Sequence, residues 1–388
     1  MTDPKRIAIF LDGTWNTVSD DTNVWRMKSL CAADGTTQVV CYSAGVGTAF
    51  GYKVRGGLFG YGLDDEIKDA YKWLIDNFET CDELFIFGFS RGAYTARSLS
   101  GFISKCGLLS PGAPLSVNQL YERYRRRTAR TIRELLNIPK DAVDDSDTSA
   151  IEGAWIVRYC AAIDIKFVGV WDTVGALGVP AWPLNFFNVA RYQFLETHLR
   201  LTNTFAFHAL AVDEHRALFA PTLWTRTIPH DDGNHRPPER SLQEVEQRWF
   251  VGAHANVGGG YPNDILAQAP LKWLMEKAAG HGLKFKSTIT LDHSELPSIA
   301  DSYGTFLKGV YPYLSIPYYR PIGRAPDVGT KFTTSTINET IDYSVFDRWK
   351  SDTSYRPRNI LEWARRVGAD PSDLEQSVRT DNPAIAVP

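Results

Sequence analysis

The clearest chemical signal in this chain of 388 residues is a serine placed between two glycines. Gly88, Ser90 and Gly92 form the pattern Gly-x-Ser-x-Gly, between an apolar run at residues 83–88 and a helical pattern at residues 93–106. In a nucleophile elbow this pattern turns a strand sharply into a helix and exposes the serine hydroxyl. The helix N-terminus also directs backbone N–H groups towards developing negative charge. An ordinary turn with a capping serine uses the same residue types, but the setting favours a nucleophile.

A serine hydroxyl is a weak nucleophile unless a base removes its proton. Of the eight histidines, only His254 clearly follows a late apolar strand, and a run of glycines comes soon after it. In α/β hydrolases the third member is a carboxylate between the serine and the histidine in chain order, which holds the imidazole tautomer. Asp172, at the end of the apolar run at residues 167–171, is the first choice. Asp213 is the alternative, although the charged string around it fits a buried ion-pair network equally well.

Acyl chemistry also needs hydrogen-bond donors for an oxyanion. The backbone N–H of Arg91 is one predicted donor, because this residue follows the nucleophile. The N–H of Gly13 or of Thr14 is the other, in the turn after an apolar run at residues 7–11. Asp12, in the same turn, is a secondary candidate whose ordinary interpretation is a turn or capping aspartate.

The scaffold that positions these residues follows from the order of the patterns. Short apolar runs alternate with helical patterns in the first part of the chain, at residues 7–11, 38–42, 63–78, 83–88 and 93–106. A further apolar run at residues 163–171 and a predicted strand at residues 245–252 flank residues 205–213, which have a helical or mixed pattern. This order predicts an α/β-hydrolase-like fold with a mostly parallel central sheet flanked by helices. We expect one domain over residues 1–388, with helical and irregular insertions or cap segments at residues 110–160, 178–240 and 295–345.

Composition excludes several other classes of protein. With 44% hydrophobic and 22% charged residues the chain is an ordinary globular protein, and a net charge of −3 does not favour nucleic-acid binding. Five cysteines without zinc or redox spacing predict no disulfide framework and fit a reducing compartment. Neither a signal peptide nor a transmembrane helix is expected, so we predict a protein that is cytoplasmic, or exported without a signal peptide. No metal and no organic cofactor is expected.

Three other patterns indicate competing chemistry. Asp12-Gly13-Thr14 is similar to an aspartyl-phosphate signature, but that chemistry needs an aspartate where Phe10 stands. In the glycine-rich stretch at residues 45–62, the run at residues 56–62 is not followed by Gly-Lys-Ser/Thr, so a flexible loop over the pocket is favoured over a phosphate-binding loop. An arginine-rich helix predicted at residues 120–136 could contact lipid head groups or nucleic acid, and pairing with the acidic residues 141–147 is favoured.

Four strings together resemble a known family, and they lie at residues 10–16, 88–97, 169–174 and 252–261. They are similar to the α/β-hydrolase domain of uncharacterised bacterial and fungal proteins, which is shared with type VI secretion phospholipase effectors of the first lipase class. The resemblance runs from about residue 7 to residue 275. It implies a serine esterase or phospholipase, with Ser90, Asp172 and His254 on the matching positions. One departure is clear, because the family often has Ser-Asp after the histidine, where Ala255 and Asn256 stand here.

These observations predict a serine hydrolase that cleaves carboxylic esters of small molecules or lipids through an acyl-enzyme intermediate, as a lipase or phospholipase would. Peripheral contact with a membrane is an expected partner interaction, and nucleic acid is not. Aromatic residues at residues 178–187, at Trp224 and at residues 311–319 predict a cap with an apolar inner surface. The alternative is a catalytically silent hydrolase-fold module that binds a partner or a nucleotide.

Overall fold

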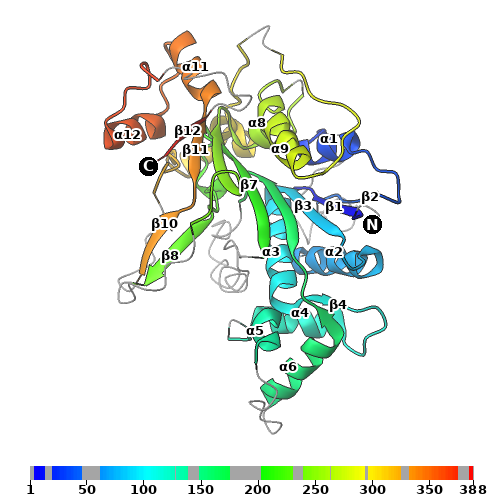
Figure 1. Ribbon diagram of the computed structural model, residues 1–388. Coiled ribbons are helices and arrows are strands. Elements are labelled where there is room, and N and C mark those ends of the chain that lie inside the picture. Colours follow the sequence, from blue (N-terminus) through cyan, green and yellow to red (C-terminus); the bar gives the residue numbers. More distant parts are fainter. Residues whose placement is uncertain are drawn as a thin grey trace.

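An eight-stranded sheet runs through the centre of the computed structural model, in the order β12-β11-β9-β7-β6-β3-β1-β2 (Figure 1). Neighbouring strands from β2 to β11 are parallel, and β12 is antiparallel to β11. Helices cover both faces, which confirms the predicted α/β-hydrolase-like class. The structure describes residues 4–13, 20–45, 62–126, 128–138, 148–174, 202–229, 239–262, 264–292, 296–324, 332–374 and 384–387.

The elements have the following bounds. The strands of the central sheet are β1 Arg6–Leu11, β2 Gln38–Ser43, β3 Glu83–Phe89, β6 Ile165–Trp171, β7 Asn203–Ala211, β9 Val245–Phe250, β11 Glu339–Asp342 and β12 Ala384–Ala386. Two small sheets pair β4 Leu108–Leu109 with β5 Cys160–Ala161, and β8 Thr225–Pro229 with β10 Phe332–Thr336. The helices are α1 Asn23–Leu30, α2 Leu63–Asn77, α3 Arg91–Cys106, α4 Val117–Arg125, α5 Ile132–Leu136, α6 Thr148–Tyr159, α8 His254–Gly258, α9 Gln268–Gly280, α10 Ser302–Thr305, α11 Tyr343–Ser351 and α12 Arg358–Val367. Short 3₁₀ turns are η3 Ala217–Phe219, η4 Phe306–Gly309 and η5 Tyr311–Tyr313.

The two faces of the sheet carry different side chains. Ile7 and Ile9 of β1 belong to an aliphatic layer under α2 and α3, whereas Phe10 belongs to an aromatic layer under α1 and α9. In the aromatic layer Phe10 stacks on Phe87 of β3, with ring centroids 4.9 Å apart. Because both faces are covered, β1, β3 and β6 are nearly continuous apolar runs instead of alternating patterns.

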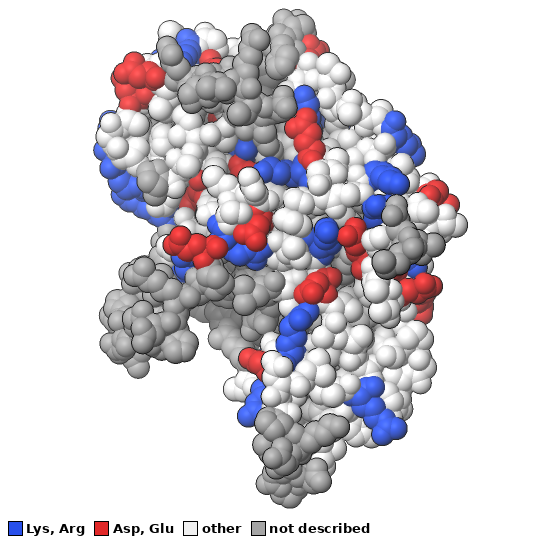
Figure 2. Space-filling view, in the orientation of Figure 1, with Lys and Arg blue, Asp and Glu red and all other residues white. Residues whose placement is uncertain are grey.

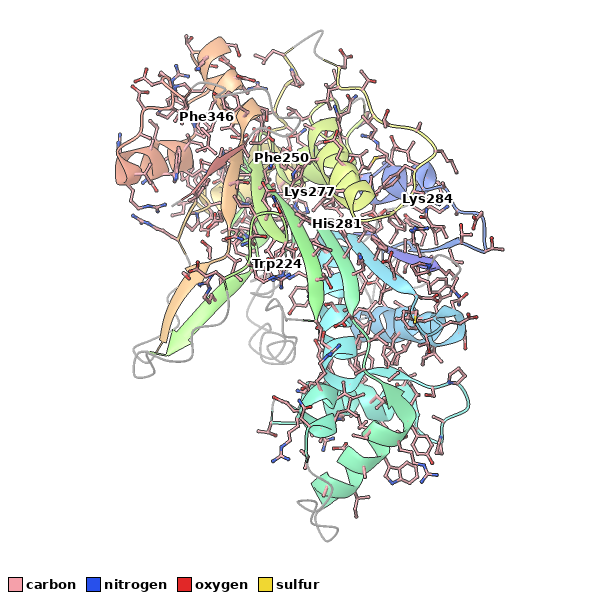
Figure 3. All side chains as sticks on the ribbon, viewed as in Figure 1. Trp224, Phe250, Lys277, His281, Lys284 and Phe346 are labelled. Atoms are coloured by element: carbon pink, nitrogen blue, oxygen red, sulfur yellow. The ribbon has the colours of Figure 1, made fainter. Side chains whose placement is uncertain are left out.

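Helix α9 illustrates how the aromatic face is closed. Figure 3 labels Lys277 on this helix and His281 directly after its end, where this part of the chain lies against the sheet. The His281 ring stacks on Phe205 of β7 at 3.5 Å, and the Lys277 ammonium lies 2.8 Å from Glu246 of β9. The ammonium group of Lys277 therefore reaches over the sheet while its methylene groups remain packed on it.

Two sequence-based predictions need correction in the second half of the chain. Residues 205–213, which have a helical or mixed pattern, lie mainly in strand β7. This strand is flanked by β6 and β9, so burial on both faces removes the alternation that marks a strand. The segments 178–240 and 295–345 are therefore not simply insertions, because they contain β7 and β11 of the central sheet.

The C-terminal part of the chain is packed into the fold. A third apolar cluster joins Trp249 of β9 and Ile341 of β11 to Phe346 of α11 and Trp363 of α12. In Figure 1 these two helices lie beside β11 and β12, at one end of the central sheet. The sheet therefore depends on residues far beyond the last recognisable motif.

The arginine-rich segment forms two helices, α4 and α5, instead of the one predicted at residues 120–136. The second helix starts anew because Thr131 and Glu134 form a capping box. Arg123 and Arg126 pair with Glu152 of α6. The acidic residues 141–147 and most of the glycine-rich stretch, residues 46–61, lie outside the described residues. Figure 2 shows charges of both signs interspersed over the visible face, and no described helix is long and apolar enough to cross a membrane.

Candidate active site

Ser90 lies in a tight turn between β3 and α3. Its backbone angles, φ 58° and ψ −120°, belong to a region that residues other than glycine rarely adopt. A Cβ atom on Gly88 would lie 2.4 Å from the carbonyl oxygen of Gly92, and one on Gly92 would lie 2.2 Å from that of Leu11. Both predicted elbow glycines therefore allow the start of α3 to approach β3 and β1 closely.

His254 connects the serine to a carboxylate. Its Nε2 atom is 2.8 Å from Ser90 Oγ, and its Nδ1 atom is 2.5 Å from Asp172 Oδ2. With the Nδ1–H group donating to the carboxylate, Nε2 is left as the acceptor for the serine hydroxyl. Ser90 is partly exposed, whereas His254 and Asp172 are buried. The three side chains thus form a hydrogen-bonded series whose serine end is open to solvent.

The order of the strands brings these residues together. Ser90 directly follows β3, Asp172 directly follows β6, and His254 comes four residues after the end of β9. Because β3, β6, β7 and β9 are parallel neighbours, their carboxyl ends meet at one edge of the sheet. Residues distant in the sequence are therefore adjacent in the fold.

A buried histidine fixes the turn after β6. His208 of β7 accepts a hydrogen bond at Nε2 from the Thr173 N–H group at 3.1 Å, and its Nδ1 lies 3.4 Å from Gln247 Oε1. Burial, reinforced by Arg97, lowers the pKa of His208 to about 3. This ring is neutral at neutral pH and can hold the backbone next to Asp172.

Asp172 has a second strong partner besides His254. Arg320 donates from Nη1 to Oδ1 at 2.6 Å and from Nη2 to Oδ2 at 2.9 Å, and the Ala211 N–H group donates to Oδ1 at 3.1 Å. Burial by itself raises the pKa of Asp172, but the Arg320 charge and the hydrogen bond from His254 outweigh it. The pKa is held well below its usual range, so the carboxylate is ionised at neutral pH.

Asp213, the alternative acid, has a different position. Its Oδ2 atom accepts hydrogen bonds from the Gly252 N–H group at 2.7 Å and from the Tyr355 hydroxyl at 3.1 Å. Burial raises the pKa of this carboxyl group. Gly252, with φ 116°, stands two residues before His254. Asp213 therefore anchors the loop that carries the histidine, and its hydrogen bonds go to that loop and to Tyr355.

Glu214 is a site residue that carries no motif. Its Oε2 atom accepts hydrogen bonds from the His254 N–H group at 3.2 Å and from the Ser302 hydroxyl at 2.9 Å. It also forms a buried ion pair with Arg216, whose Nη2 lies 2.8 Å away. Burial raises its pKa, but the hydrogen bond and charge of Arg216 outweigh burial and lower it to about 2. This pair corresponds to the buried ion-pair network that the charged residues around Asp213 also predicted.

The predicted oxyanion donors divide into three cases. Arg91 is the first residue of α3, where backbone N–H groups have no acceptor within the helix. The Gly13 N–H group donates to Asp12 Oδ1 at 2.7 Å, so in this structure it is already engaged. Thr14 lies outside the described residues. Asp12 also accepts hydrogen bonds from the hydroxyls of Thr22 and Tyr42, as a buried turn residue would.

Aromatic rings surround the histidine. The His254 ring lies 4.7 Å from Phe89 and 5.0 Å from Phe219, and Phe219 lies 5.7 Å from Phe306. Phe306 begins the turn at residues 306–316, which we call the apolar turn. It presents large side chains that are 50–89% exposed: Leu307, Val310, Tyr313, Leu314 and Ile316. Ring contacts therefore lead from the histidine to the apolar turn, and the Arg216 guanidinium lies over the Phe219 ring at 3.5 Å.

Asn256 stands where the similar family often has an aspartate. Its Oδ1 atom accepts hydrogen bonds from the N–H groups of Ala253 and Ala300, both at 3.1 Å, and its Nδ2 lies 3.2 Å from both carboxyl oxygens of Asp264. The amide thus donates and accepts at once, which a carboxylate cannot do. Within the described ranges, no group of three or more His, Cys, Asp or Glu side chains could hold a metal ion.

Comparison with known proteins identifies a family to which the sequence is similar. The family model of the Tle1-like catalytic domain of type VI secretion system phospholipase effectors matches residues 5–277. An uncharacterized protein of Saccharomyces cerevisiae is 27% identical over 240 residues, which cover 57% of this chain and 33% of that protein. The matched part therefore spans about a third of the length of this curated relative.

Three solved structures are similar in part. An uncharacterized protein from Pseudomonas aeruginosa has a TM-score of 0.41 at 17% identity, covering 73% of this chain and 46% of its own. The Tle1 effector, bound to the VgrG spike of the type 6 secretion system, has a TM-score of 0.36 at 19% identity, covering 67% and 51%. The peroxisomal alpha-beta-hydrolase Lpx1 from Saccharomyces cerevisiae has a TM-score of 0.27 at 14% identity, covering 76% and 82%.

Proposed function

This chain belongs to the family of Tle1-like catalytic domains of type VI secretion system phospholipase effectors, and we propose that it is a serine hydrolase that cleaves carboxylic esters of lipids. One observation carries this function: the hydrogen-bonded series Ser90–His254–Asp172 at the ends of parallel strands. A serine in this setting is activated by its base, and the base is oriented by the carboxylate.

In the acylation step, Ser90 Oγ forms a bond to the carbonyl carbon of the ester while His254 Nε2 takes the hydroxyl proton. The carbonyl oxygen becomes an oxyanion, for which the N–H groups of Arg91 and Thr14 are the proposed donors. Asp172 stabilises the imidazolium that forms. As the tetrahedral intermediate collapses, the bond to the alcohol oxygen breaks and His254 returns its proton to that oxygen. The acyl group remains on Ser90.

In the deacylation step, water takes the place of the alcohol. His254 Nε2 accepts a proton from the water as its oxygen attacks the acyl carbon, and the same proton then returns to Ser90 Oγ. The products are the carboxylic acid and the free enzyme. The chain's own residues move every proton in both steps, and the partial exposure of Ser90 gives the ester a point of access.

An apolar substrate is supported by the surroundings of the site. The rings of Phe89, Phe219 and Phe306 form apolar surface next to His254, and the apolar turn extends it into solvent. A lipid in a membrane or micelle must leave its apolar surroundings to be cleaved, so apolar side chains beside the site favour its transfer. We therefore propose peripheral contact of this turn with a lipid surface.

The function is tested with purified wild-type protein, the Ser90→Ala variant and Ser110→Ala as a control, since Ser110 is exposed. We expect the wild type and the control to react with a fluorophosphonate probe and to hydrolyse p-nitrophenyl butyrate and phospholipid vesicles. The Ser90→Ala variant should do neither while keeping the same circular dichroism spectrum. A folded wild type that never reacts with the probe would support the silent binding module instead.

A further inference from the structure

We propose that Arg320 positions the proposed triad: it fixes both carboxylate oxygens of Asp172 and sets the lowest pH at which the site works. This inference rests on the proposed function, because it assigns a positioning role within the same site. It goes beyond the family match, which ends at residue 277.

The guanidinium of Arg320 is held on two sides. Towards Asp172 it forms two parallel hydrogen bonds, at 2.6 Å and 2.9 Å, the fork geometry that suits a carboxylate. On the other side, Nη1 donates to the carbonyl oxygen of Ala211 at 3.0 Å and Nη2 to that of Phe219 at 2.6 Å. Both side chains of the ion pair are 0% exposed. The carboxylate therefore cannot rotate away from His254 without breaking several hydrogen bonds.

A buried carboxylate without a cation would be protonated readily. Burial is the largest influence on the pKa of Asp172 and raises it, and the Arg320 charge is the largest of the influences that lower it. A protonated Asp172 would carry no charge to stabilise the imidazolium. Arg320 thus keeps Asp172 in the form that the mechanism requires, down to acidic pH.

Other titratable groups around the pair come from several elements. His254 of α8 faces Asp172, and Glu214 lies near both Arg320 and His254. Glu214 pairs with Arg216, and the charge of Arg320 also lowers its pKa. Glu214 and Tyr318 in turn raise the pKa of Arg320, after the larger influence of Asp172. His208 of β7 is neutral. Asp172 and Glu214 are therefore balanced by two arginines, and His254 is the member of this group that changes charge during the reaction.

The segment before Arg320 is anchored to the same part of the fold. The Tyr318 N–H group donates to the carbonyl oxygen of His215 at 2.8 Å, one residue after Glu214. The guanidinium also reaches back to the ends of β7 and η3 through Ala211 and Phe219. The residues after η5 thus complete the site from outside the part matched by the family.

The test compares Arg320→Met and Arg320→Lys with the wild type. The control is Arg248→Met, because Arg248 is a buried arginine that pairs with Glu246 at 2.6 Å on β9. For each protein, kcat and KM for p-nitrophenyl butyrate, the rate of fluorophosphonate labelling and the melting temperature are measured from about pH 3 to about pH 9.

For Arg320→Met we expect kcat at neutral pH to fall at least about tenfold with little change in KM, and the acid limb of the rate profile to move up by about 1–3 pH units. The sign follows from Asp172: without the cation its pKa rises, so activity is lost at a higher pH and returns as the pH increases. Arg320→Lys keeps the charge but not the fork, so the acid limb should largely recover while kcat stays reduced. The control should keep the wild-type profile, whatever its melting temperature.

The outcomes separate this inference from the proposed function. A wild type that neither labels nor hydrolyses esters refutes the proposed function itself. An active wild type with an Arg320→Met variant that changes only its melting temperature refutes the role of Arg320 alone. If Arg320→Met does not fold, Arg320→Lys decides, because an unchanged kcat in that variant contradicts the need for the fork.

Discussion

Replacing Asp172 by asparagine tests how the proposed acid acts, because the amide has one acceptor where the carboxylate has two. At the Oδ1 position the structure has two donors, Arg320 Nη1 and the Ala211 N–H group. At the Oδ2 position it has Arg320 Nη2 and His254 Nδ1. Of these four donors only His254 Nδ1 can become an acceptor, through a change of tautomer, so the amide oxygen should take the Oδ1 position and the NH₂ group should face the histidine.

This orientation forces the wrong tautomer on His254. With an NH₂ group opposite it, Nδ1 must accept a hydrogen bond, so the ring proton moves to Nε2. Nε2 can then no longer accept the hydroxyl proton of Ser90. A triad with the wrong tautomer loses about 10⁴-fold in kcat, which corresponds to about 5.4 kcal/mol of transition-state stabilisation. Because the tautomer of the neutral ring does not depend on pH, the loss of kcat should persist across the whole pH range, unlike the loss in Arg320→Met.

The same substitution leaves Arg320 buried without its counter-charge. Breaking a buried ion pair by removing one charge typically costs about 3–5 kcal/mol of folding free energy. Adding Arg320→Met to Asp172→Asn removes the uncompensated charge, so the double variant should be more stable than Asp172→Asn while remaining inactive. From Asp172→Asn to the double variant, stability should thus recover while activity does not.

The assays are kcat/KM for p-nitrophenyl butyrate, the rate of fluorophosphonate labelling, and urea unfolding followed by circular dichroism. Asp172→Asn with less than a tenfold loss of kcat/KM would refute the tautomer reasoning. A double variant less stable than Asp172→Asn would refute the view that the unpaired arginine causes the instability.

Three further predictions concern other parts of the site. Asp213→Asn should lower the free energy of unfolding by about 1–3 kcal/mol, because it weakens the buried hydrogen bond to the Gly252 N–H group, and the labelling rate should change little. Loss of labelling without loss of stability would identify Asp213 as the acid instead. Leu314→Asp combined with Ile316→Asp should slow hydrolysis of phospholipid vesicles far more than that of p-nitrophenyl butyrate, whereas Leu136→Asp on α5, also exposed, should affect neither; equal losses on both substrates would contradict lipid contact by the apolar turn. Across p-nitrophenyl esters from two to eight acyl carbons, kcat/KM should rise, because each buried methylene stabilises the transition state by up to about 0.8 kcal/mol. A flat series would indicate a small or polar ester.

Local signals account for much of what the sequence predicts. The strand, turn and helix around Ser90 were predictable because an apolar run, two glycines at fixed spacing and a helical pattern occur in one short stretch. His254 was predictable because its loop follows a strand. Asp172 and Asp213 both follow strands closely, and only the three-dimensional arrangement shows which carboxylate meets the imidazole. Their catalytic roles stay predictions until the variants are measured.

Arg320, β11 and β12 show why the rest could not be predicted. Arg320 meets a residue 148 positions earlier in the chain, and its neighbours carry no motif. Strands β11 and β12 have 4 and 3 residues, too few for a periodic pattern. They join the sheet by pairing, β11 with β9 and β12 with β11. Such contacts are specified by tertiary packing, which a local pattern does not record.

The long reach of Arg320 has a consequence for a chain that is still being made. A ribosome adds residues from the N-terminus, so Ser90, Asp172 and His254 all emerge before their arginine. At about 5–20 residues per second, the roughly 66 residues from His254 to Arg320 take about 3–13 s. During that interval the nascent protein would have its nucleophile and base but not the cation that holds its acid. With the roles proposed above, each molecule would become fully active only after Arg320 has emerged, which delays any attack on lipids by a chain that has not yet reached this residue.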